Sequence, residues 1–175
     1  MDYFFSGKKE YRSLSNFWEN DVVVEERLYE SGEYCFHGEK YIKIGEQCEN
    51  ERKKILIEYG KTFLKPSKYT TGTIAKKMGG KKGLLLNMNE IHLWNTISVD
   101  VQYKICKWKI ANYKEVRDDL IKSQDRILIH PALRCSQLQA EKRIWEGRGI
   151  NKDGTIVVVG QNKLGKIWME LRDSL

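Results

Sequence analysis

Residues 29–44 read Tyr29-Glu-Ser-Gly-Glu33-Tyr-Cys-Phe36-His37-Gly-Glu-Lys40-Tyr-Ile-Lys-Ile44, and the rest of the chain is organised around this stretch. A Ser-Gly turn is followed by a pattern that predicts a helix over 32–45. Residues four or seven apart lie on one side of a helix. Glu33, His37 and Lys40 therefore share one side of the predicted helix, with aromatic rings beside them.

This side of the helix has two interpretations. Ser31 is placed to cap the first turn, and Glu33 near the positive helix N-terminus is favoured in its ionised form. A carboxylate, an imidazole and an ammonium group beside aromatic rings suit chemistry at a sugar carbon. Alternatively, the segment is a solvated polar face with an internal contact from Glu33 to His37 or Lys40. Taken alone, the segment fits the alternative better, because charged residues usually face water.

The totals favour one domain spanning residues 1–175. A chain of 175 residues is long enough for a real core, and 41% hydrophobic with 31% charged residues is ordinary for a soluble globular protein. No apolar run approaches the ~20 residues that cross a bilayer, and the first residues lack a basic leader with an apolar core. Four scattered cysteines form no CxxC pair. We therefore expect a reduced, cytoplasmic protein with no metal, no cofactor and no membrane partner.

The net charge of +7 and the pI near 9.1 favour anionic partners. Between Lys61 and Lys82 there are seven lysines and no acidic residue, with a tyrosine and three glycines interleaved. This pattern indicates a surface for phosphate groups or for nucleic acid, including DNA. A lysine-rich proteome also produces such runs by drift, so the stretch alone is a weak signal.

Helices are predicted over much of the remaining chain. After 32–45, the expected ranges are 49–59 with Gly60 as its stop, 73–78 closed by Gly79 and Gly80, 89–111, 112–123, and a last helix after residue 162. In 89–111, apolar residues recur every four positions, so this is a core helix whose tryptophans are core residues by default. The last helix has on one side Leu164, Ile167, Trp168, Leu171 and Leu175.

Strands are predicted to be short and few. Apolar or β-branched runs lie at 3–5, 21–24, 127–129 and 155–159, whereas 132–154 is less regular. Helices outnumber strands and do not alternate with them, which predicts an α+β fold, a single compact, mainly helical domain with a small β-sheet. Neither GxGxxG after a strand nor GxxxxGK[ST] is present.

Several stretches together resemble one family. They are Leu14-Ser15-Asn16-Phe17, Tyr29 leading into Ser31-x-Glu33-Tyr34-x-Phe36-x-x-x-Lys40, Ala75-Lys-Lys-Met78-Gly79, Trp94 with Lys109 downstream, Arg143-Ile-Trp145-x-Gly147, and Gly160-x-Asn162-x-Leu164-Gly165-x-x-x-Met169-x-x-Arg172. In order and spacing the chain resembles the NADAR (NAD- and ADP-ribose-associated) superfamily over nearly its whole length. The motif with Glu33 and Lys40 and the terminal Gly-x-Asn-x-Leu-Gly block are the specific ones.

The resemblance implies one compact, mainly helical domain that cleaves the bond between a ribose C1 and a nitrogen. One branch of the family acts on a phosphoribosylated intermediate of riboflavin synthesis, and another removes ADP-ribose from modified guanine bases. This chain departs from the family pattern at Lys142, where an acidic residue is usual and Glu141 is adjacent. It also has His130 where a glutamate is frequent, and 131–142 is longer than in the riboflavin branch.

The chemistry assigns roles to the matched residues. Cleavage of a ribosyl C1–N bond develops positive charge at C1 and needs a proton on the leaving nitrogen. Glu33 is the candidate carboxylate, and it can also activate water. Lys40 either pairs with a substrate phosphate or attacks ring-opened ribose as an amine and forms a Schiff base. Glu141 is the reserve general acid, and His130 is a weaker one.

Other matched residues are candidates for ligand binding. Trp94 and Trp145 can stack on a base, although a core position suits Trp94 equally well. Phe17 offers a further ring for stacking. Backbone N–H groups at the start of the last helix can face a phosphate. Alternatively, the glycines there only give the turn its shape. The full set of expected ligand-binding residues is Ser15, Asn16, Phe17, Phe36, His37, Trp94, Lys109, Arg143, Trp145, Gly160, Asn162 and Gly165.

Three functions follow from the sequence. The first is an ADP-ribosyl glycohydrolase acting on a modified nucleobase, which the basic stretch from Lys61 to Lys82 favours. The second is an N-glycosidase acting on the riboflavin intermediate. The third is a non-catalytic module that binds NAD or ADP-ribose, which the lysine at position 142 suggests.

Overall fold

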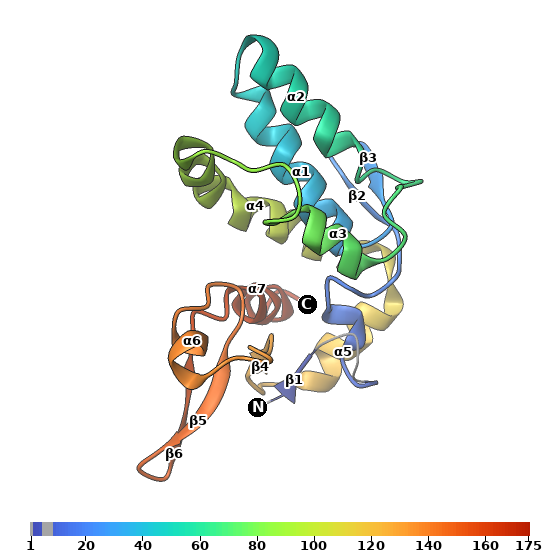
Figure 1. Ribbon diagram of the computed structural model, residues 1–175. Coiled ribbons are helices and arrows are strands. Elements are labelled where there is room, and N and C mark those ends of the chain that lie inside the picture. The colour runs from blue at the N-terminus through green and yellow to red at the C-terminus, as the bar shows by residue number, and fades with distance from the viewer. Residues whose placement is uncertain (1, 5–8) are drawn as a thin grey trace. The chain divides into compact units, whose positions relative to one another are not determined.

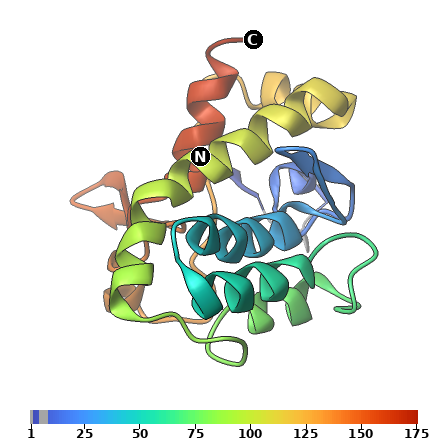
Figure 2. The ribbon, with the colours of Figure 1, turned by 90° about the horizontal axis from the view of Figure 1, so that it is seen from above.

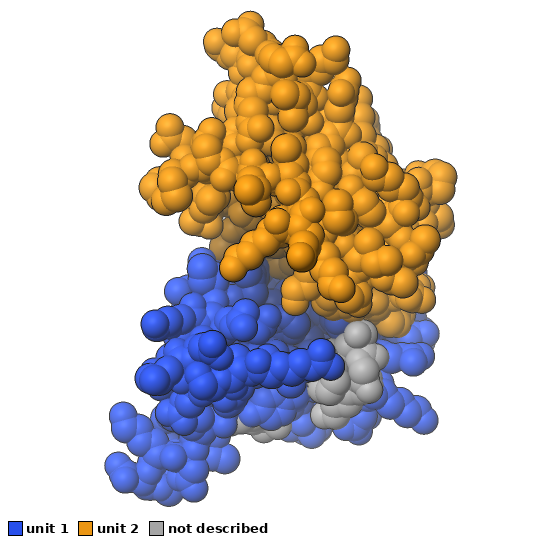
Figure 3. All heavy atoms as spheres, viewed as in Figure 1, with its two compact units in different colours: residues 1–15, 110–175 blue, residues 16–109 orange. Residues whose placement is uncertain are grey.

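The computed structural model describes residues 2–4 and 9–175 (Figure 1). By its internal contacts the chain divides into two compact units, which Figure 3 shows in different colours. Unit 2 is residues 16–109, and unit 1 is residues 1–15 together with 110–175. The predicted run at 3–5 lies partly outside the described residues, since Phe5 is not among them.

Unit 2 is built from helices and one small hairpin. The helices are α1 (Gly32–Glu46), α2 (Asn50–Lys61), α3 (Gly72–Met78) and most of α4 (Met88–Asn112), and the antiparallel strands are β2 (Val22–Val24) and β3 (Arg27–Tyr29). The two ribbon views agree that α1 and α2 run side by side (Figures 1 and 2). The sequence predicted all four helices, with boundaries that differ by one or two residues.

Gly60 does not end α2 as the sequence predicted. It lies inside the helix, one residue before the end, and is buried. A Cβ on Gly60 would lie 2.6 Å from Cγ1 of Ile42 and 2.9 Å from the carbonyl oxygen of Gly38, both on α1. Glycine is needed at this position because the two helices approach closely, not because the helix stops there.

The core of unit 2 gathers the inner faces of these elements. On α4, Val101 and Ile105 of the predicted spacing of four are buried, whereas Leu93 and Ile97 of the same series are partly buried, and Trp94, seven before Val101, is buried. Tyr29 of β3 packs in the same cluster, and its hydroxyl donates to the buried carboxylate of Glu39 on α1 at 2.5 Å. This core surrounds α1, so even the polar residues of α1 are largely removed from water.

In its described residues, unit 1 combines two-stranded pairs with the end of α4, three further helices and a 3₁₀ turn. The elements are β1 (Asp2–Tyr3), the 3₁₀ turn Arg12–Leu14, α5 (Lys114–Ser123), β4 (Leu128–Ile129), α6 (Gln137–Glu141), β5 (Arg148–Lys152), β6 (Thr155–Val159) and α7 (Lys163–Arg172). Strands β1 and β4 pair in parallel, and β5 and β6 form an antiparallel hairpin.

The segment 132–154 is more regular than its sequence indicated. Ser136 and Gln139 form a capping box that starts α6, and Arg148–Lys152 pairs with β6 as β5. Strand β5 has little apolar alternation, so its structure comes from the ladder with the β-branched strand β6. Leu175, expected on the inner side of the last helix, lies beyond the end of α7 and is exposed.

The described part of the chain therefore has an α+β fold that is mainly helical, as predicted. Its strands form three separate two-stranded sheets and not one small sheet. No helix in the described residues has the length and apolar character needed to cross a bilayer.

Candidate functional site

The polar side of α1 is buried. Glu33, His37 and Lys40 expose 7%, 9% and 8% of their surface, so the face is not solvated, although the internal contact of Glu33 with His37 that the alternative expected is present. Burial of three ionisable side chains on one helical face is uncommon, because each charge loses its hydration. The spacing in the sequence predicted that these residues lie together, and the packing of unit 2 encloses them.

Glu33 is fixed at the start of α1 by two contacts. Its carboxylate Oε1 lies 2.8 Å from Nε2 of His37, and its backbone N–H donates to the carbonyl oxygen of Asn16 at 2.8 Å. Ser31 occupies the N-cap position, but its hydroxyl makes no capping hydrogen bond, contrary to the sequence prediction. The carboxylate is therefore oriented by its neighbours while it sits near the positive end of the helix.

His37 is held between the helix and the end of α3. A Cβ added at Gly79 would overlap the His37 ring, so only glycine permits this approach. The Nδ1 atom of His37 is buried and has no hydrogen-bond partner among the described residues. The ring of Phe36 meets the imidazole edge-on at 5.7 Å between centroids.

Lys40 presents a buried amine to the same region. Its Nζ donates to the carbonyl oxygen of Gly79 and lies 5.0 Å from the centre of the Tyr41 ring. Burial lowers the pKa of Lys40 to about 8, and the nearby charge of Glu33 opposes that shift in part. A lysine with such a pKa has a substantial neutral fraction near physiological pH, which is what a nucleophilic amine requires.

Asn16 connects α1 with α4. Its side-chain amide and that of Gln102 exchange two hydrogen bonds, at 2.8 and 3.0 Å, and both groups are buried. The next residue, Phe17, lies against Gly72 at the start of α3, where a Cβ would approach the ring to 2.9 Å. Both expected binding residues are thus fixed beside the N-terminus of α1.

Trp94 and Lys109 are the remaining candidates in unit 2. Trp94 is buried in the apolar cluster, with its ring edge-on to Phe36 at 5.0 Å, which favours the core interpretation. Lys109 is almost fully buried, and its amine lies 5.4 Å from the centre of the Trp18 ring.

In unit 1, the side-chain amide of Asn162 is hydrogen-bonded to the backbone at the end of a neighbouring strand. Its Nδ2 donates to the carbonyl oxygen of Leu128, and its Oδ1 accepts from the N–H of His130, so one buried amide joins β4 to the start of α7. Gly165 leaves no room for a Cβ beside the Leu128 carbonyl, and Gly160 has a φ of +80° that favours glycine.

The backbone at this turn is already hydrogen-bonded. The N–H groups of residues 161–164 donate to the carbonyl oxygens of residues 143–146. They are therefore committed to holding the segment 143–146 in place. The turn-shaping alternative explains these glycines without a phosphate.

The other candidates of unit 1 are more open to solvent. Glu141 and Arg143 are exposed, whereas Trp145 is half-buried. Glu141 accepts a 3.3 Å hydrogen bond from Gln137 on the same short helix, α6. Ser15 is buried at the end of the 3₁₀ turn. These candidates belong to unit 1, whereas the buried cluster on α1 is built within unit 2.

Two residues at the site were not predicted as site residues from the sequence. Gly79 contacts both His37 and Lys40, and the sequence marks it only as a helix end and as part of a family motif. Gln102 pairs with Asn16 and lies on the buried side of α4. A glutamine within an apolar helical stripe was the available signal, because buried amides need partners.

Comparisons with known proteins agree with this architecture. A family model described as "NADAR domain" matches residues 3–175. Among solved structures, the NMR structure of the E. coli protein YbiA is similar, with a TM-score of 0.62 and 18% sequence identity. The match covers 99% of this chain and 83% of the YbiA chain, and at this identity it supports the fold alone. No curated protein matches.

Proposed function

This chain belongs to the NADAR domain family, and from that premise we propose that it is an N-glycosidase that hydrolyses a ribose C1–N bond. The substrate we propose is a guanine base carrying ADP-ribose, within nucleic acid. The observation that carries the proposal is the buried cluster on α1, in which a carboxylate, an imidazole and an amine of lowered pKa occupy one helical face.

Glu33 has the environment of a catalytic carboxylate. As the C1–N bond lengthens, positive charge grows on C1, and a carboxylate in a site with little water stabilises that charge strongly. Its contact with His37 fixes the direction of the carboxylate before substrate arrives. In the hydrolytic route the same carboxylate takes a proton from the water whose oxygen bonds to C1, and the leaving nitrogen receives a proton from an acid.

Lys40 offers a second route through its amine. An N-linked ribose can open to an imine at C1, and neutral Nζ can add to that carbon. Departure of the protonated base nitrogen leaves a Schiff base between Nζ and C1, and water then releases the sugar and restores the amine. The lowered pKa of Lys40 supports this route. Its charged form equally suits a substrate phosphate.

The general acid is proposed to be Glu141, as the family resemblance suggests. Its carboxylate is exposed on α6. The variant Glu141→Gln tests this role directly. An acid that protonates the leaving group should affect poor leaving groups most, so the loss of rate should depend on the base released.

One experiment tests the function. The protein is incubated in parallel with guanine-ADP-ribosylated DNA and with the phosphoribosylated aminopyrimidine of riboflavin synthesis, and released sugar is measured. Variants Glu33→Gln, Lys40→Ala and Lys40→Arg are run beside the wild type, and borohydride is added during turnover to trap a Schiff base. Release of ADP-ribose from the DNA by the wild type, and not by Glu33→Gln, supports the proposal.

The other outcomes identify the alternatives. Release of ribose 5-phosphate from the pyrimidine, with no action on the DNA, selects the riboflavin branch. Tight calorimetric binding of ADP-ribose without turnover of either substrate establishes a non-catalytic module. A Schiff base trapped in the wild type and absent in Lys40→Arg assigns the covalent route.

A further inference from the structure

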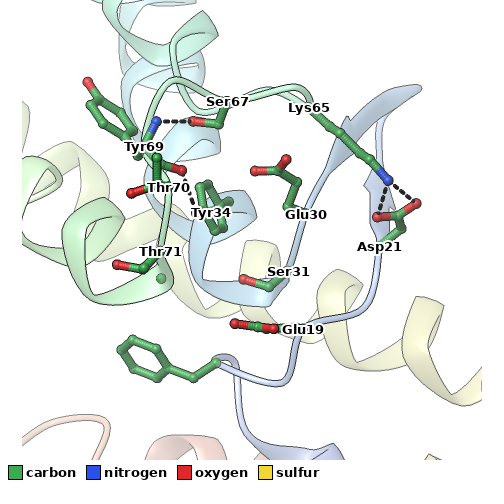
Figure 4. A pocket seen from close by; sticks show the side chains of 12 residues that line it. Glu19, Asp21, Glu30, Ser31, Tyr34, Lys65, Ser67, Tyr69, Thr70 and Thr71 are labelled. Atoms are coloured by element: carbon green, nitrogen blue, oxygen red, sulfur yellow. Dashed lines mark hydrogen bonds and ion pairs between the residues drawn. The ribbon is translucent and has the colours of Figure 1, made fainter.

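A pocket of about 400 Å³ lies beside the start of α1, within unit 2 (Figure 4). It is lined by residues from the segment before β2, from the N-terminus of α1, and from the loop between α2 and α3. Among its walls, only Phe17 is a ligand-binding residue predicted from the sequence. The pocket is large enough for a flat ring system, since ligand sites start near 300 Å³.

Most hydrogen-bond donors in the pocket wall are already used. The hydroxyl of Tyr34 donates to the carbonyl oxygen of Tyr69 at 2.6 Å. The hydroxyl of Ser67 donates to the carbonyl oxygen of Thr62 at 2.8 Å. Both carboxylate oxygens of Asp21 lie 2.9 Å from the amine of Lys65, which neutralises that cation. The wall therefore has little left to offer an anion.

Four polar side chains in the wall have no hydrogen-bond partner in the described residues, namely Glu19, Glu30, Ser31 and the exposed Thr70. In the part of the chain that the structure describes, the carboxylates of Glu19 and Glu30 form no hydrogen bond or ion pair. The hydroxyl of Ser31 is buried, with 2% of the residue exposed, and it too has no hydrogen-bond partner there. Figure 4 shows the side chains of Glu19, Glu30 and Ser31 ending in the same opening. A buried, unpartnered hydroxyl is costly unless a ligand completes it.

The free groups define the ligand. Two carboxylates that no cation neutralises repel phosphate, and they accept hydrogen bonds from N–H groups. Burial is the largest cause that raises the pKa of Tyr34, and the negative charges of Glu30 and Glu19 raise it further. Both charges therefore act on the same side chain of the pocket wall. Phe17 adds an aromatic face on which a flat ring can stack. The pocket thus suits a planar group whose edge donates hydrogen bonds.

The pocket adjoins the turn of α1 that carries the proposed catalytic carboxylate. Tyr34 of the wall follows Glu33 directly, and consecutive Cα atoms are about 3.8 Å apart. On the other side, Phe17 follows Asn16, whose carbonyl oxygen accepts the N–H of Glu33. The pocket wall thus shares the first turn of α1 with Glu33, although the Glu33 carboxylate is not itself among the lining residues.

We propose that this pocket binds the nucleobase of the substrate through Glu19, Glu30 and Ser31, and that it selects guanine. The assignment rests on the proposed function. Among bases, guanine presents two adjacent donors, N1–H and the exocyclic amine, which match one carboxylate in a bidentate pair. Adenine presents an acceptor beside its amine, and that acceptor would face a carboxylate.

Direct binding tests the pocket independently of catalysis. The full chain is titrated by calorimetry with guanosine, inosine and adenosine, where inosine lacks only the exocyclic amine. We expect guanosine to bind at least about 10-fold more tightly than inosine, and adenosine to bind more weakly still, because an unpaired charged acceptor is costly. Glu30→Gln and Glu19→Gln should each lower guanosine affinity by about 10-fold or more. Glu58→Gln, an exposed glutamate on α2, makes the same charge change away from the pocket and should have no effect.

Each remaining outcome is informative. Equal affinity for the three nucleosides, or unchanged guanosine binding in both pocket variants, overturns the proposal. A polyamine that binds where guanosine does not shows that the pocket takes a cation and likewise overturns it. If the wild type releases ADP-ribose while both variants keep its kcat/KM, the pocket assignment fails and the glycosidase function stands. If guanosine is selected but no substrate is cleaved, the proposed function fails and the pocket remains.

Discussion

Oε1 of Glu33 lies 2.8 Å from Nε2 of His37, one helical turn later on α1, and both side chains are buried. The imidazole has this carboxylate as its only hydrogen-bond partner in the described residues, because Nδ1 has none. Such an arrangement fixes the carboxylate in one orientation, which is what a group acting on a sugar carbon needs.

The first prediction concerns the charge of Glu33. Glu33→Gln keeps the size and a hydrogen bond to His37 but removes the negative charge that would stabilise C1. We expect kcat to fall by at least about 100-fold, with ligand affinity retained. Single-turnover kinetics on the substrate found in the parallel assay, with calorimetry of ADP-ribose, measures both quantities. Equal losses of rate and affinity would instead assign Glu33 a binding role.

The second prediction concerns the stability of the fold against pH. The folded pKa of Lys40 is about 8, below its ordinary value of 10.5, so between these two pH values the unfolded chain binds more protons. Stability therefore rises with pH in this window, as the cost of burying the charge is relieved. Relative to Lys40→Met, the free energy of unfolding of the wild type should increase by on the order of 2 kcal/mol from pH 7 to 10, since one pKa unit is about 1.4 kcal/mol.

Urea unfolding at several pH values measures this gain. Lys53→Met, which removes an exposed lysine on α2, is the control and should run parallel to the wild type. A constant difference between wild type and Lys40→Met across the window would show that Lys40 is not desolvated in solution.

The third prediction uses two neighbouring glycines. A Cβ at Gly79 would overlap the His37 ring, whereas a Cβ at Gly80 has its nearest neighbour at 3.5 Å. Gly79→Ala should therefore displace the end of α3 from α1, lower stability by about 1–3 kcal/mol and reduce activity. Gly80→Ala is the matched control and should be close to neutral. Thermal unfolding with activity assays compares the two, and equal behaviour of both variants would argue against the packing described for His37.

The helix α1 was predictable because its signals are local. Spacings of four and seven place Glu33, His37 and Lys40 on one side whatever the rest of the chain does. The same reasoning failed at Gly60, because the residue next to it across the interface, Ile42, is 18 positions away in the sequence. A glycine that permits close helix packing and a glycine that ends a helix look alike in one sequence.

The partners of the site were less predictable than its charged residues. Gly79 meets Lys40 from 39 positions away, and Gln102 meets Asn16 from 86 positions away. Periodicity describes one element at a time and says nothing about which elements pack together. Burial of the polar face was missed for the same reason, since it depends on the elements packed around α1 and not on α1 itself.

The fourth prediction concerns Asn162 in unit 1. Asn162→Ala leaves the N–H of His130 and the carbonyl of Leu128 without partners, and it places alanine at a φ of +47°. The variant loses two buried hydrogen bonds and forces alanine into a left-handed backbone conformation. Together these effects should lower the free energy of unfolding by on the order of 3 kcal/mol. Denaturant unfolding measures the destabilisation. Asn151→Ala removes one exposed hydrogen bond at the β5–β6 turn and should cost less than about 1 kcal/mol. A small effect at Asn162 would remove the structural role assigned to it.

The fifth prediction tests the basic stretch from Lys61 to Lys82 as a nucleic-acid surface. All seven of its lysines are exposed, and the adjacent pair Lys76 and Lys77 lies on α3. If this stretch holds DNA, Lys76→Gln with Lys77→Gln should weaken binding of all sequences alike. The slope of log K against log salt should also become shallower, by about 0.9 for each duplex phosphate that the variant no longer neutralises.

The matched control is Lys53→Gln with Lys54→Gln, an adjacent exposed pair on α2 outside the stretch. Both double variants change the net charge of +7 equally, so a general electrostatic attraction predicts the same slope for both. Fluorescence anisotropy with labelled DNA over a series of salt concentrations distinguishes the cases. A shallower slope only in the α3 variant locates the phosphate contacts there, because long-range attraction alone would not separate the two pairs. Identical slopes would place the DNA elsewhere and leave the lysine-rich stretch as a product of composition.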